Sequence, residues 1–404
     1  MPNPLERPYA DLKVVELATD PGGEMTGYLL AGMGADVIKV EPPEGSPTRA
    51  VGPWLKGEEG PDDSLAFWYY NSNKRSAVVD YRTKDGMATL EALLAGADIF
   101  LCTLQPRALR SAGIDHEALS RRFPNLIVLS VTPFGLTGPW ADYKSSELVG
   151  LAAGGPLFMC GYDDHAIPPI LPGGNQAYHV AASFAHKALL VALIDRQMNG
   201  GGQVVDVSMH EGCAVTVELG NPYWFYPKAL VERQTCRHAQ PVRTQPAIFE
   251  CADGKWVYFV LVVAEPKPFA NLVAWMDSKG MAADLTDEAY QDFAYRQAHY
   301  AHVQGVVECF FLVHDAETMF HEGQERELPI AVISAPEELF EDPHNIERGF
   351  FVEVEHEGIG TFKYPGAPYQ FSAFTSVPRT RAPKLGEHTN EVLGALAGEA
   401  VGAS

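Results

Sequence analysis

Residues 12–40 read LKVVELATDPGGEMTGYLLAGMGADVIKV. The run at 12–17 predicts a strand, residues 24–34 carry apolar side chains at helical spacing, and residues 37–40 form the next short apolar run. The pattern continues with a helical stretch at 87–95 and strand-like runs at 99–102 and 126–131. Such alternation is typical of βαβ units, so we predict an α/β fold with a parallel sheet and helices on both faces.

The sequence pattern after these units indicates three further regions. A long helix is predicted over residues 178–197, ended by Asn199-Gly-Gly-Gly202, and a buried strand over 204–207. Aromatic clusters, helical segments and a hairpin signal at Asp253-Gly254 indicate a small α+β domain over residues 221–328. Past residue 329 a further strand and a second hairpin are predicted.

Composition restricts the possible partners. The chain has 404 residues with 52 Asp plus Glu against 30 Lys plus Arg, a formal charge of -22. Binding to nucleic acid or to anionic lipid needs clustered Lys and Arg, so neither partner is expected. No apolar run approaches the ~18 residues that span a bilayer, and no signal peptide is evident. Six cysteines without metal-ligand spacing fit a reduced cytoplasm and predict no metal site.

Four short motifs are candidates for chemistry. Asp20-Pro-Gly-Gly23 lies between a predicted strand and a predicted helix. It fits either a tight turn or an anion-binding site. Asn73-Lys74-Arg75 is a compact cationic cluster, either a solvated face or part of an anion site. Asp163-Asp164 fits a turn, and His179 and His186, seven residues apart, fit a helix face in the core or a catalytic pair. The residues alone indicate an α/β enzyme with an anionic ligand.

A set of longer motifs carries a resemblance to a known family. The opening motifs are Leu30-Ala-Gly-Met-Gly-Ala-Asp-Val-Ile-Lys-Val-Glu-Pro-Pro43 and Tyr70-Asn-Ser-Asn-Lys-Arg-Ser76. The later ones are Asn125-Leu-Ile-Val-Leu-Ser130, Pro133-Phe-Gly-Leu-Thr-Gly-Pro139, Gly200-Gly-Gly-Gln-Val-Val-Asp-Val-Ser-Met209, Glu341-Asp-Pro-His344, Arg348-Gly-Phe-Phe351 and Leu385-Gly-Glu-His-Thr-Asn390. Together these motifs closely resemble family III CoA-transferases, the group that contains formyl-CoA transferase and carnitine CoA-transferase.

The resemblance implies an architecture and a ligand. A Rossmann-like large domain would be built from residues 1–220 and 329–404, with the small domain of residues 221–328 inserted, and two chains would form interlocked rings. Coenzyme A, as free CoA or acyl-CoA substrate, would contact Asp20, Pro21, Gly22, Lys74, Arg75, Thr103, Leu104 and Lys144. Thr103 and Leu104 replace the family's usual Asn-Phe, and Arg107 stands where members often carry Gly. Lys144 and Glu147 would flank the active site.

The family's chemistry depends on one Asp. Its carboxylate attacks the acyl-CoA thioester to give a mixed anhydride, then an enzyme-CoA thioester, and finally CoA passes to a second carboxylate. This Asp stands at the start of the long helix. Counting back without gaps from Gly202-Gln203 places it at Ala177 or Tyr178, and no Asp or Glu occurs between Asp164 and Asp195. We therefore expect the usual nucleophile to be absent.

Several hypotheses follow. In the first, the chain is a subunit of a heteromeric CoA-transferase that moves CoA from an acyl-CoA, such as succinyl-CoA, to an organic acid, and a paralogous partner supplies the Asp. In the second, Glu147, Asp163 or Asp164 replaces it and the chain works as a homodimer. An acyl-CoA racemase would need a His near Ser146 and an Asp near Ala177, and since both are absent this hypothesis is disfavoured. A CoA-binding or scaffolding protein without catalysis is the remaining class.

Overall fold

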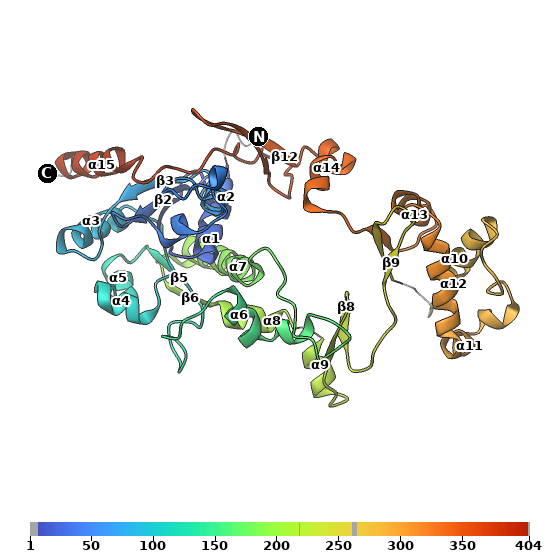
Figure 1. Cartoon of the computed structure of the whole chain (residues 1–404). Helices are drawn as coiled ribbons and strands as arrows, with labels where there is room; N and C mark the ends of the chain where they lie inside the picture. Colours follow the sequence, from blue (N-terminus) through green and yellow to red (C-terminus); the bar gives the residue numbers. More distant parts are fainter. Residues whose placement is uncertain (1–6, 218, 261–264, 403–404) are drawn as a thin grey trace. The chain divides into compact units, whose positions relative to one another are not determined.

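A six-stranded parallel sheet forms the centre of the computed structural model, which describes residues 7–217, 219–260 and 265–402. Its strand order is β3-β2-β1-β4-β5-β6, and Figure 1 labels β2, β3, β5 and β6 of this sheet. All five strand pairs are parallel. The strands are β1 (Lys13–Leu17), β2 (Asp36–Glu41), β3 (Arg75–Val78), β4 (Ile99–Cys102), β5 (Ile127–Thr132) and β6 (Val204–Ser208). This is the doubly wound Rossmann order, so the predicted α/β fold with a parallel sheet is confirmed.

Helices bury both faces of the sheet because successive strand residues point to opposite sides. Val14 and Ile127 face a core formed with α1 (Pro21–Gly32) and α7 (Gln176–Asn199), which lie side by side. Their neighbours Val15 and Val128 face a second core. That second core is formed with α3 (Lys84–Ala95), α4 (Pro106–Ala112), α5 (His116–Arg122) and α15 (Thr389–Gly402).

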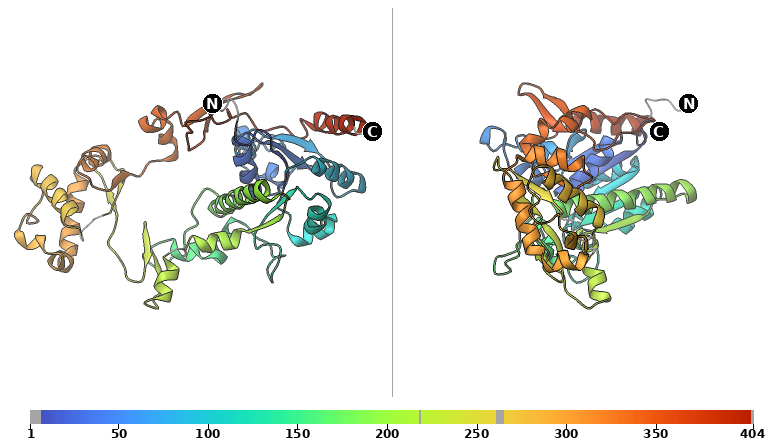
Figure 2. Two further views of the ribbon diagram at one scale, coloured as in Figure 1. Left: turned by 180° about the vertical axis from the view of Figure 1, so that it is seen from behind. Right: turned by 90° about the vertical axis from the view of Figure 1, so that its right-hand side faces the viewer.

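Helix α7, the long green helix in Figure 2, buries a face of small residues. Ala181, Ala185 and Ala192 are among the fully buried positions, so the helix can lie close to the sheet and to α1. Among the described residues it is the one helix long and apolar enough to cross a membrane by length and composition. Core helices also meet that criterion, and α7 contacts α1, β5 and β6 as a core helix does.

The chain divides into two compact units. The first comprises Met1–Leu157, Leu171–Val217 and Pro343–Ser404, and the second comprises Phe158–Ile170 and Glu218–Asp342. These bounds differ from the predicted 221–328. Residues 158–170 belong to the second unit because the Asp163 amide donates to Thr235 and the Arg233 guanidinium to the Ile167 carbonyl. Residues 329–342 belong there because β11 pairs with β10.

The first unit has further elements around the sheet. They are α2 (Leu65–Tyr70), α6 (Glu147–Gly154), α8 (Met209–Val215), α14 (Pro343–Glu347) and the strands β12 (Phe351–His356) and β13 (Gly360–Pro365). β12 and β13 pair in antiparallel register, as the second hairpin signal predicted. The segment after β13 returns towards the sheet, where the His388 amide donates to the Ser76 carbonyl beside β3.

The second unit is a small α+β structure with its own core. Its elements are α9 (Gly220–Phe225), β7 (Glu232–Gln234), β8 (Arg237–Gln240), β9 (Ile248–Glu250), β10 (Trp256–Phe259), α10 (Pro266–Ser278), α11 (Phe293–Ala298), α12 (Tyr300–Leu312), α13 (Ala316–Gln324) and β11 (Ile330–Val332). β9 and β10 pair across the turn at Asp253-Gly254. The hairpin signal predicts the second of these strands over residues 255–263, and residues 261–263 of this run lie outside the described residues. Phe249, Phe259 and Phe311 pack together in this core.

Candidate active site

The loop after β1 lies where the strand order reverses. β1 has β2 on one side and β4 on the other, so the chain leaves β1 and β4 in opposite directions. In open α/β sheets ligands bind at such a switch point, beyond the carboxyl ends of the strands. Asp20 and Thr103 follow β1 and β4 directly. The structure therefore brings together two segments that the sequence places 83 residues apart.

Asp20 is the N-cap of α1. Its Oδ1 accepts hydrogen bonds from the amides of Gly22 at 2.9 Å and Gly23 at 3.1 Å, and Pro21 occupies the first helical position, where no N–H is needed. Burial raises the pKa of the Asp20 carboxyl to about 6, and the two amide hydrogen bonds only partly oppose this rise. Because Asp20 already uses these amides, an added phosphate would have to compete with a carboxylate.

The end of β4 is fitted closely to this loop. The Thr103 hydroxyl accepts a hydrogen bond from the Thr19 amide at 2.9 Å. A Cβ added at Gly23 would lie 2.2 Å from Thr103 Cγ2, so only glycine allows α1 to begin here. Leu104, 7% exposed, packs in the core under the sheet.

Lys74 lies inside a buried ion cluster next to α1. Its ammonium pairs with Glu16 Oε2 at 2.8 Å and donates to the Glu24 carbonyl at 2.8 Å and to Asn71 Oδ1 at 2.9 Å. The Lys74 side chain has no exposed area. Burial lowers its pKa despite the nearby carboxylates. The structure therefore places this predicted CoA contact below the surface, where its charge is balanced from within.

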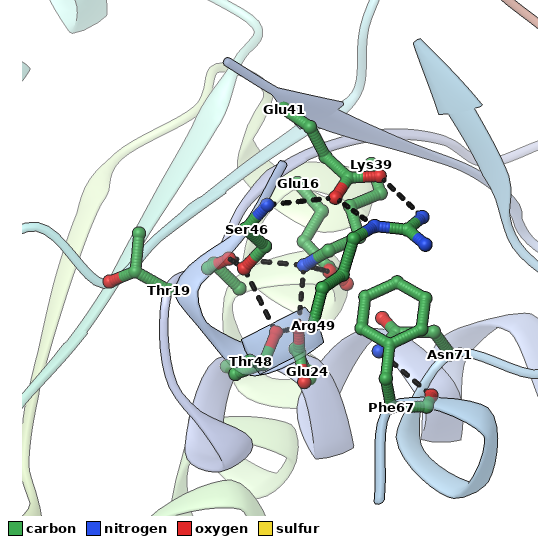
Figure 3. A network of polar contacts seen from close by, with 12 residues as sticks. Glu16, Thr19, Glu24, Lys39, Glu41, Ser46, Thr48, Arg49, Phe67 and Asn71 are labelled. Carbon is green, nitrogen blue, oxygen red and sulfur yellow. Dashed lines mark hydrogen bonds and ion pairs between the residues drawn. The ribbon is translucent and has the colours of Figure 1, made fainter. Parts of the chain in front are cut away.

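Three buried carboxylates, Glu16, Glu24 and Glu41, and three buried cations make up that cluster, and Figure 3 labels all of them except Lys74. At its edge Asp62, whose side chain is 37% exposed, also pairs with Arg49 at 2.8 Å. Lys39 pairs with Glu16 at 3.2 Å and with Glu24 at 2.8 Å, and Arg49 binds Glu41 through two nitrogens at 2.7 and 2.9 Å. Lys74 completes the set of cations. Equal numbers of opposite charges satisfy the main condition for burying ions.

Arg75 points away from this cluster. It contacts both carboxylate oxygens of Asp36, at 2.9 and 2.5 Å, and one of Glu391 at 2.9 Å. Its side chain is 28% exposed. Lys144 is exposed. Of the predicted CoA-contacting cations, Lys144 is thus the one that presents its charge to solvent without an ion pair among the described residues.

Glu147 reaches the start of α7. Its Oε1 and Oε2 accept from the Ala177 amide at 2.9 and 3.1 Å, and Oε2 also lies 3.4 Å from the Tyr178 amide. The first amides of a helix attract an anion, so a carboxylate from α6 occupies the start of α7. The side chain is half-buried.

The two positions counted for the missing Asp have different surroundings. Ala177 is completely buried, and a Cβ on Gly150 of α6 would lie 3.1 Å from the Ala177 Cβ. Tyr178 faces the loop after β1 instead: a Cβ on Gly22 would lie 3.3 Å from its ring. Burial, followed by the charges of Asp20 and Glu147, raises the pKa of Tyr178 to about 12. Tyr178 is therefore a neutral side chain at the start of α7 that faces the start of α1.

A second polar group surrounds the start of α7. The Asn175 amide nitrogen donates to the Tyr70 hydroxyl at 3.0 Å, and that hydroxyl lies 3.0 Å from His179 Nε2. Asn175 has φ 54°, a left-handed conformation that Asn tolerates better than most residues. Burial lowers the pKa of His179, which favours the neutral ring. His179 thus has a polar partner, whereas His186 packs against the Tyr9 ring.

The two loop carboxylates proposed as substitutes belong to the second unit. Asp163 pairs with Arg237, whose side chain is 6% exposed, and with Arg243 at 3.3 Å. Asp164 caps its own turn by accepting from the Ala166 amide at 2.9 Å. Both carboxylates therefore have structural partners, and the interpretation of this pair as a turn agrees with these contacts.

Sequence reasoning missed most of the buried cluster and the Asn175 group. One signal was available: Glu16 and Lys39 are charged residues within otherwise apolar strand runs, which suggests a buried pair. In the described part of the chain, no group of three or more His, Cys, Asp or Glu side chains is arranged to hold a metal ion. The site offers two carboxylates: Glu147, held by the amides at the start of α7, and Asp20, whose pKa is raised. The charges of both act on Tyr178.

Comparisons with known proteins agree with this architecture. The sequence profile of CoA-transferase family III matches residues 9–389. The chain is 33% identical over 391 residues to succinyl-CoA:(R)-benzylsuccinate CoA-transferase subunit BbsE of Thauera aromatica, covering 95% of this chain and 93% of that protein. It is 32% identical to succinyl-CoA–D-citramalate CoA-transferase of Chloroflexus aurantiacus, covering 97% and 94%.

A solved structure of a CAIB/BAIF family protein from Brucella suis superimposes with a TM-score of 0.82 at 26% identity, over 96% of this chain and 99% of that one. The match therefore extends beyond the parallel sheet to nearly the whole chain. Together with the profile and the relatives, it identifies this chain as a member of CoA-transferase family III.

Proposed function

We propose that this protein is one subunit of a heteromeric CoA-transferase that moves CoA from succinyl-CoA to an organic acid, and that a paralogous subunit supplies the nucleophilic Asp. The observation that carries the proposal is the absence of any Asp or Glu between Asp164 and Asp195, a stretch that includes the start of α7 and the two counted positions, Ala177 and Tyr178. One relative, at 33% identity, is itself called a subunit of a succinyl-CoA-dependent enzyme. Another, at 32%, carries no such word in its name, so identity alone does not decide the assembly.

In this proposal the chain still binds CoA. The loop of Asp20, Pro21 and Gly22 and the end of β4 at Thr103 lie at the switch point that favours ligands. Lys144 is the exposed cation best suited to a phosphate. Lys74 acts indirectly by holding α1 in place, since its charge is paired with Glu16.

The remaining proposed contacts complete this arrangement. Leu104 anchors the end of β4 in the core, and Arg75 pairs with Asp36. The protein works in the cytoplasm in this proposal, and the two subunits form the interlocked rings expected from the family resemblance.

The test is reconstitution. The chain is purified alone and with a paralogous family III subunit that carries Gly-Asp at the corresponding helix start, and transfer from succinyl-CoA to candidate acids is followed. We expect turnover only from the mixture, and an Asp→Ala variant of the paralogue should abolish it. Robust turnover by this chain alone would exclude the heteromer.

A second candidate is a self-sufficient enzyme in which Glu147 is the nucleophile. Its favouring observation is position: Glu147 lies at the α7 start and retains free lone pairs besides the three amide contacts. Its carboxylate would attack the thioester carbonyl, form a mixed anhydride and release CoA thiolate. The thiolate would attack the glutamyl carbonyl, which breaks the anhydride, releases the donor acid and leaves a Glu147–CoA thioester. The acceptor carboxylate would displace the thiolate again to form a second anhydride, whose acyl group passes to CoA and frees Glu147. Glu147→Gln keeps the size of the side chain but removes this nucleophile. Loss of turnover in that variant, with a hydroxylamine-sensitive CoA thioester mapped to Glu147 in the native chain, would support this candidate.

A CoA-binding protein without a role in transfer is distinguished by one further variant. Lys144→Ala in this chain should lower the turnover of the mixture if the subunit presents CoA. Unchanged kinetics, together with unchanged CoA affinity, would favour a scaffold.

A further inference from the structure

An open cavity of about 680 Å³ lies within the first unit, between α1 and residues 348–379. Its walls are strongly aromatic: Tyr28, Tyr69, Phe350, Tyr369, Phe371 and Phe374 all line it. The volume is in the range of pockets that hold small organic molecules. None of the candidate active-site residues described above lines it.

The charge of the cavity is opposite to that of the protein. Arg348 and Arg379 line it, and no Asp or Glu is among the described residues of its wall. The chain as a whole carries -22. The pocket, with two guanidinium groups and no carboxylate, therefore differs in charge from the rest of this acidic chain, and this difference needs a physical explanation.

Arg379 is held by neutral groups alone. It donates to Ser72 Oγ at 3.0 Å, to the Tyr28 hydroxyl at 3.2 Å and to the carbonyls of Pro365 and Tyr69, each at 2.6 Å. The guanidinium carbon also lies 4.7 Å from the Tyr28 ring centroid and 5.1 Å from that of Tyr69. Burial lowers the pKa of Arg379, as expected for a cation without a carboxylate partner.

These contacts leave binding capacity for an anion. Four hydrogen bonds use four of the five N–H donors of the Arg379 guanidinium and leave one. Arg348 is exposed, and its side chain forms no hydrogen bond or ion pair with any residue that the structure describes. Its planar fork can bind a carboxylate through two parallel hydrogen bonds.

We propose that this cavity binds an organic carboxylate whose body is an aromatic ring or an alkyl group of similar size. Arg348 binds the carboxylate, Arg379 supplies the remaining N–H and a fixed positive charge, and the aromatic walls, including Phe374, enclose the body. The proposal goes beyond CoA transfer and does not depend on it, because the site shares no residue with the α7 start.

Isothermal titration calorimetry on the purified chain tests this with three matched probes. 3-Phenylpropionate carries a ring and a charge, 3-phenylpropanamide carries the ring alone, and butyrate carries the charge without the ring. We expect measurable binding of 3-phenylpropionate and affinities at least roughly tenfold weaker for the other two, because each lacks one of the two recognised features.

Variants locate the binding. Arg348→Ala removes a side chain with no structural partner, so it should fold normally and weaken 3-phenylpropionate binding by roughly tenfold or more. Phe374→Ala should weaken it as well. Arg121→Ala, an exposed arginine on α5, is the matched control and should bind as the native chain does.

Several results would overturn the proposal. The amide could bind as tightly as the acid, or Arg348→Ala could bind like the native chain. Competition by adenosine 3′,5′-bisphosphate that depends on Arg348 would assign the cavity to a nucleotide. Loss of binding on self-association, seen by sedimentation, would assign it to a second copy of the chain. Each outcome is independent of whether CoA transfer needs a partner subunit.

Discussion

Replacing Lys74 by Met tests whether this residue supports the fold or contacts ligand directly. Met has a similar length and no charge, so Lys74→Met removes the ammonium with little change in volume. The ammonium now makes three contacts, to Glu16, the Glu24 carbonyl and Asn71, within 2.9 Å. The buried cluster would change from three charges of each sign to an excess of one carboxylate.

The expected loss follows from the burial of the partner. Glu16 and Lys74 both have side chains with no exposed area. Breaking a buried pair by removing one partner costs about 3–5 kcal/mol, because the remaining charge is desolvated without compensation. Glu16 keeps Lys39 at 3.2 Å, which places the expected loss at the lower end, about 3 kcal/mol. Urea unfolding followed by circular dichroism measures this value.

Arg75→Met is the matched control, since it removes the neighbouring cation of the same motif. Its ion pairs are partly exposed, and such pairs contribute about 0–1 kcal/mol. CoA affinity is measured on both variants under conditions where they are folded. A Lys74→Met chain as stable as the native one but with CoA binding lost would refute the structural role and restore Lys74 as a ligand contact.

Three further outcomes are expected. Gly27→Ala should lower the free energy of unfolding by about 1–3 kcal/mol in urea titrations, since the new Cβ would lie 1.8 Å from Glu16 Oε2. Unchanged stability would mean that the Glu16–Lys74 ion pair can shift to make room for the methyl group. Asp20 has a folded-state pKa raised above its unfolded value, so its contribution to stability is full below about pH 4 and is lost as pH rises through about 6. Asp20→Asn keeps a helix cap and should flatten this part of the stability curve; an identical slope would contradict the raised pKa. Tyr178→Asp should give a folded chain with detectable CoA transfer from succinyl-CoA, whereas Ala177→Asp should be destabilised because its side chain is buried; the reverse result would place the missing nucleophile at Ala177.

The sheet was predictable because its strands are buried on both faces. Residues 99–102 were predicted as a strand and form β4 with the same bounds, since a short apolar run between two turns has few alternatives. The long helix differed by only two residues at each end, Gln176–Asn199 against 178–197. Helix ends are set by capping groups, and here the cap of α7 comes from Glu147, which no local pattern could supply.

The cationic motif shows why the site was harder to predict than the fold. The residues left two interpretations of this cluster, a solvated face or an anion site, and the family resemblance implied that Lys74 and Arg75 both contact CoA. Successive residues at the start of a strand point to opposite sides. Lys74 therefore lies in the buried cluster, whereas Arg75 pairs with Asp36 outside it. Two of the three partners of Lys74, Glu16 and Glu24, come from β1 and α1. Contacts between segments that are distant in the sequence depend on how neighbouring strands are aligned. That alignment is set by the whole sheet and cannot be read from the Asn73-Lys74-Arg75 motif.

Separate elements constrain the region where the sequence count places the expected Asp. Gly23 must be glycine because Thr103 from β4 lies against it, and Asp20 fixes the amides of the same turn. Glu147 fixes the start of α7 from a third element, and Tyr178 closes the gap between the two helix starts. A loop shaped by three separate elements at a strand switch point is suited to present a ligand, not to react with it. This geometry agrees with the role that we propose for the chain, in which it holds CoA and a paralogous subunit supplies the reacting Asp.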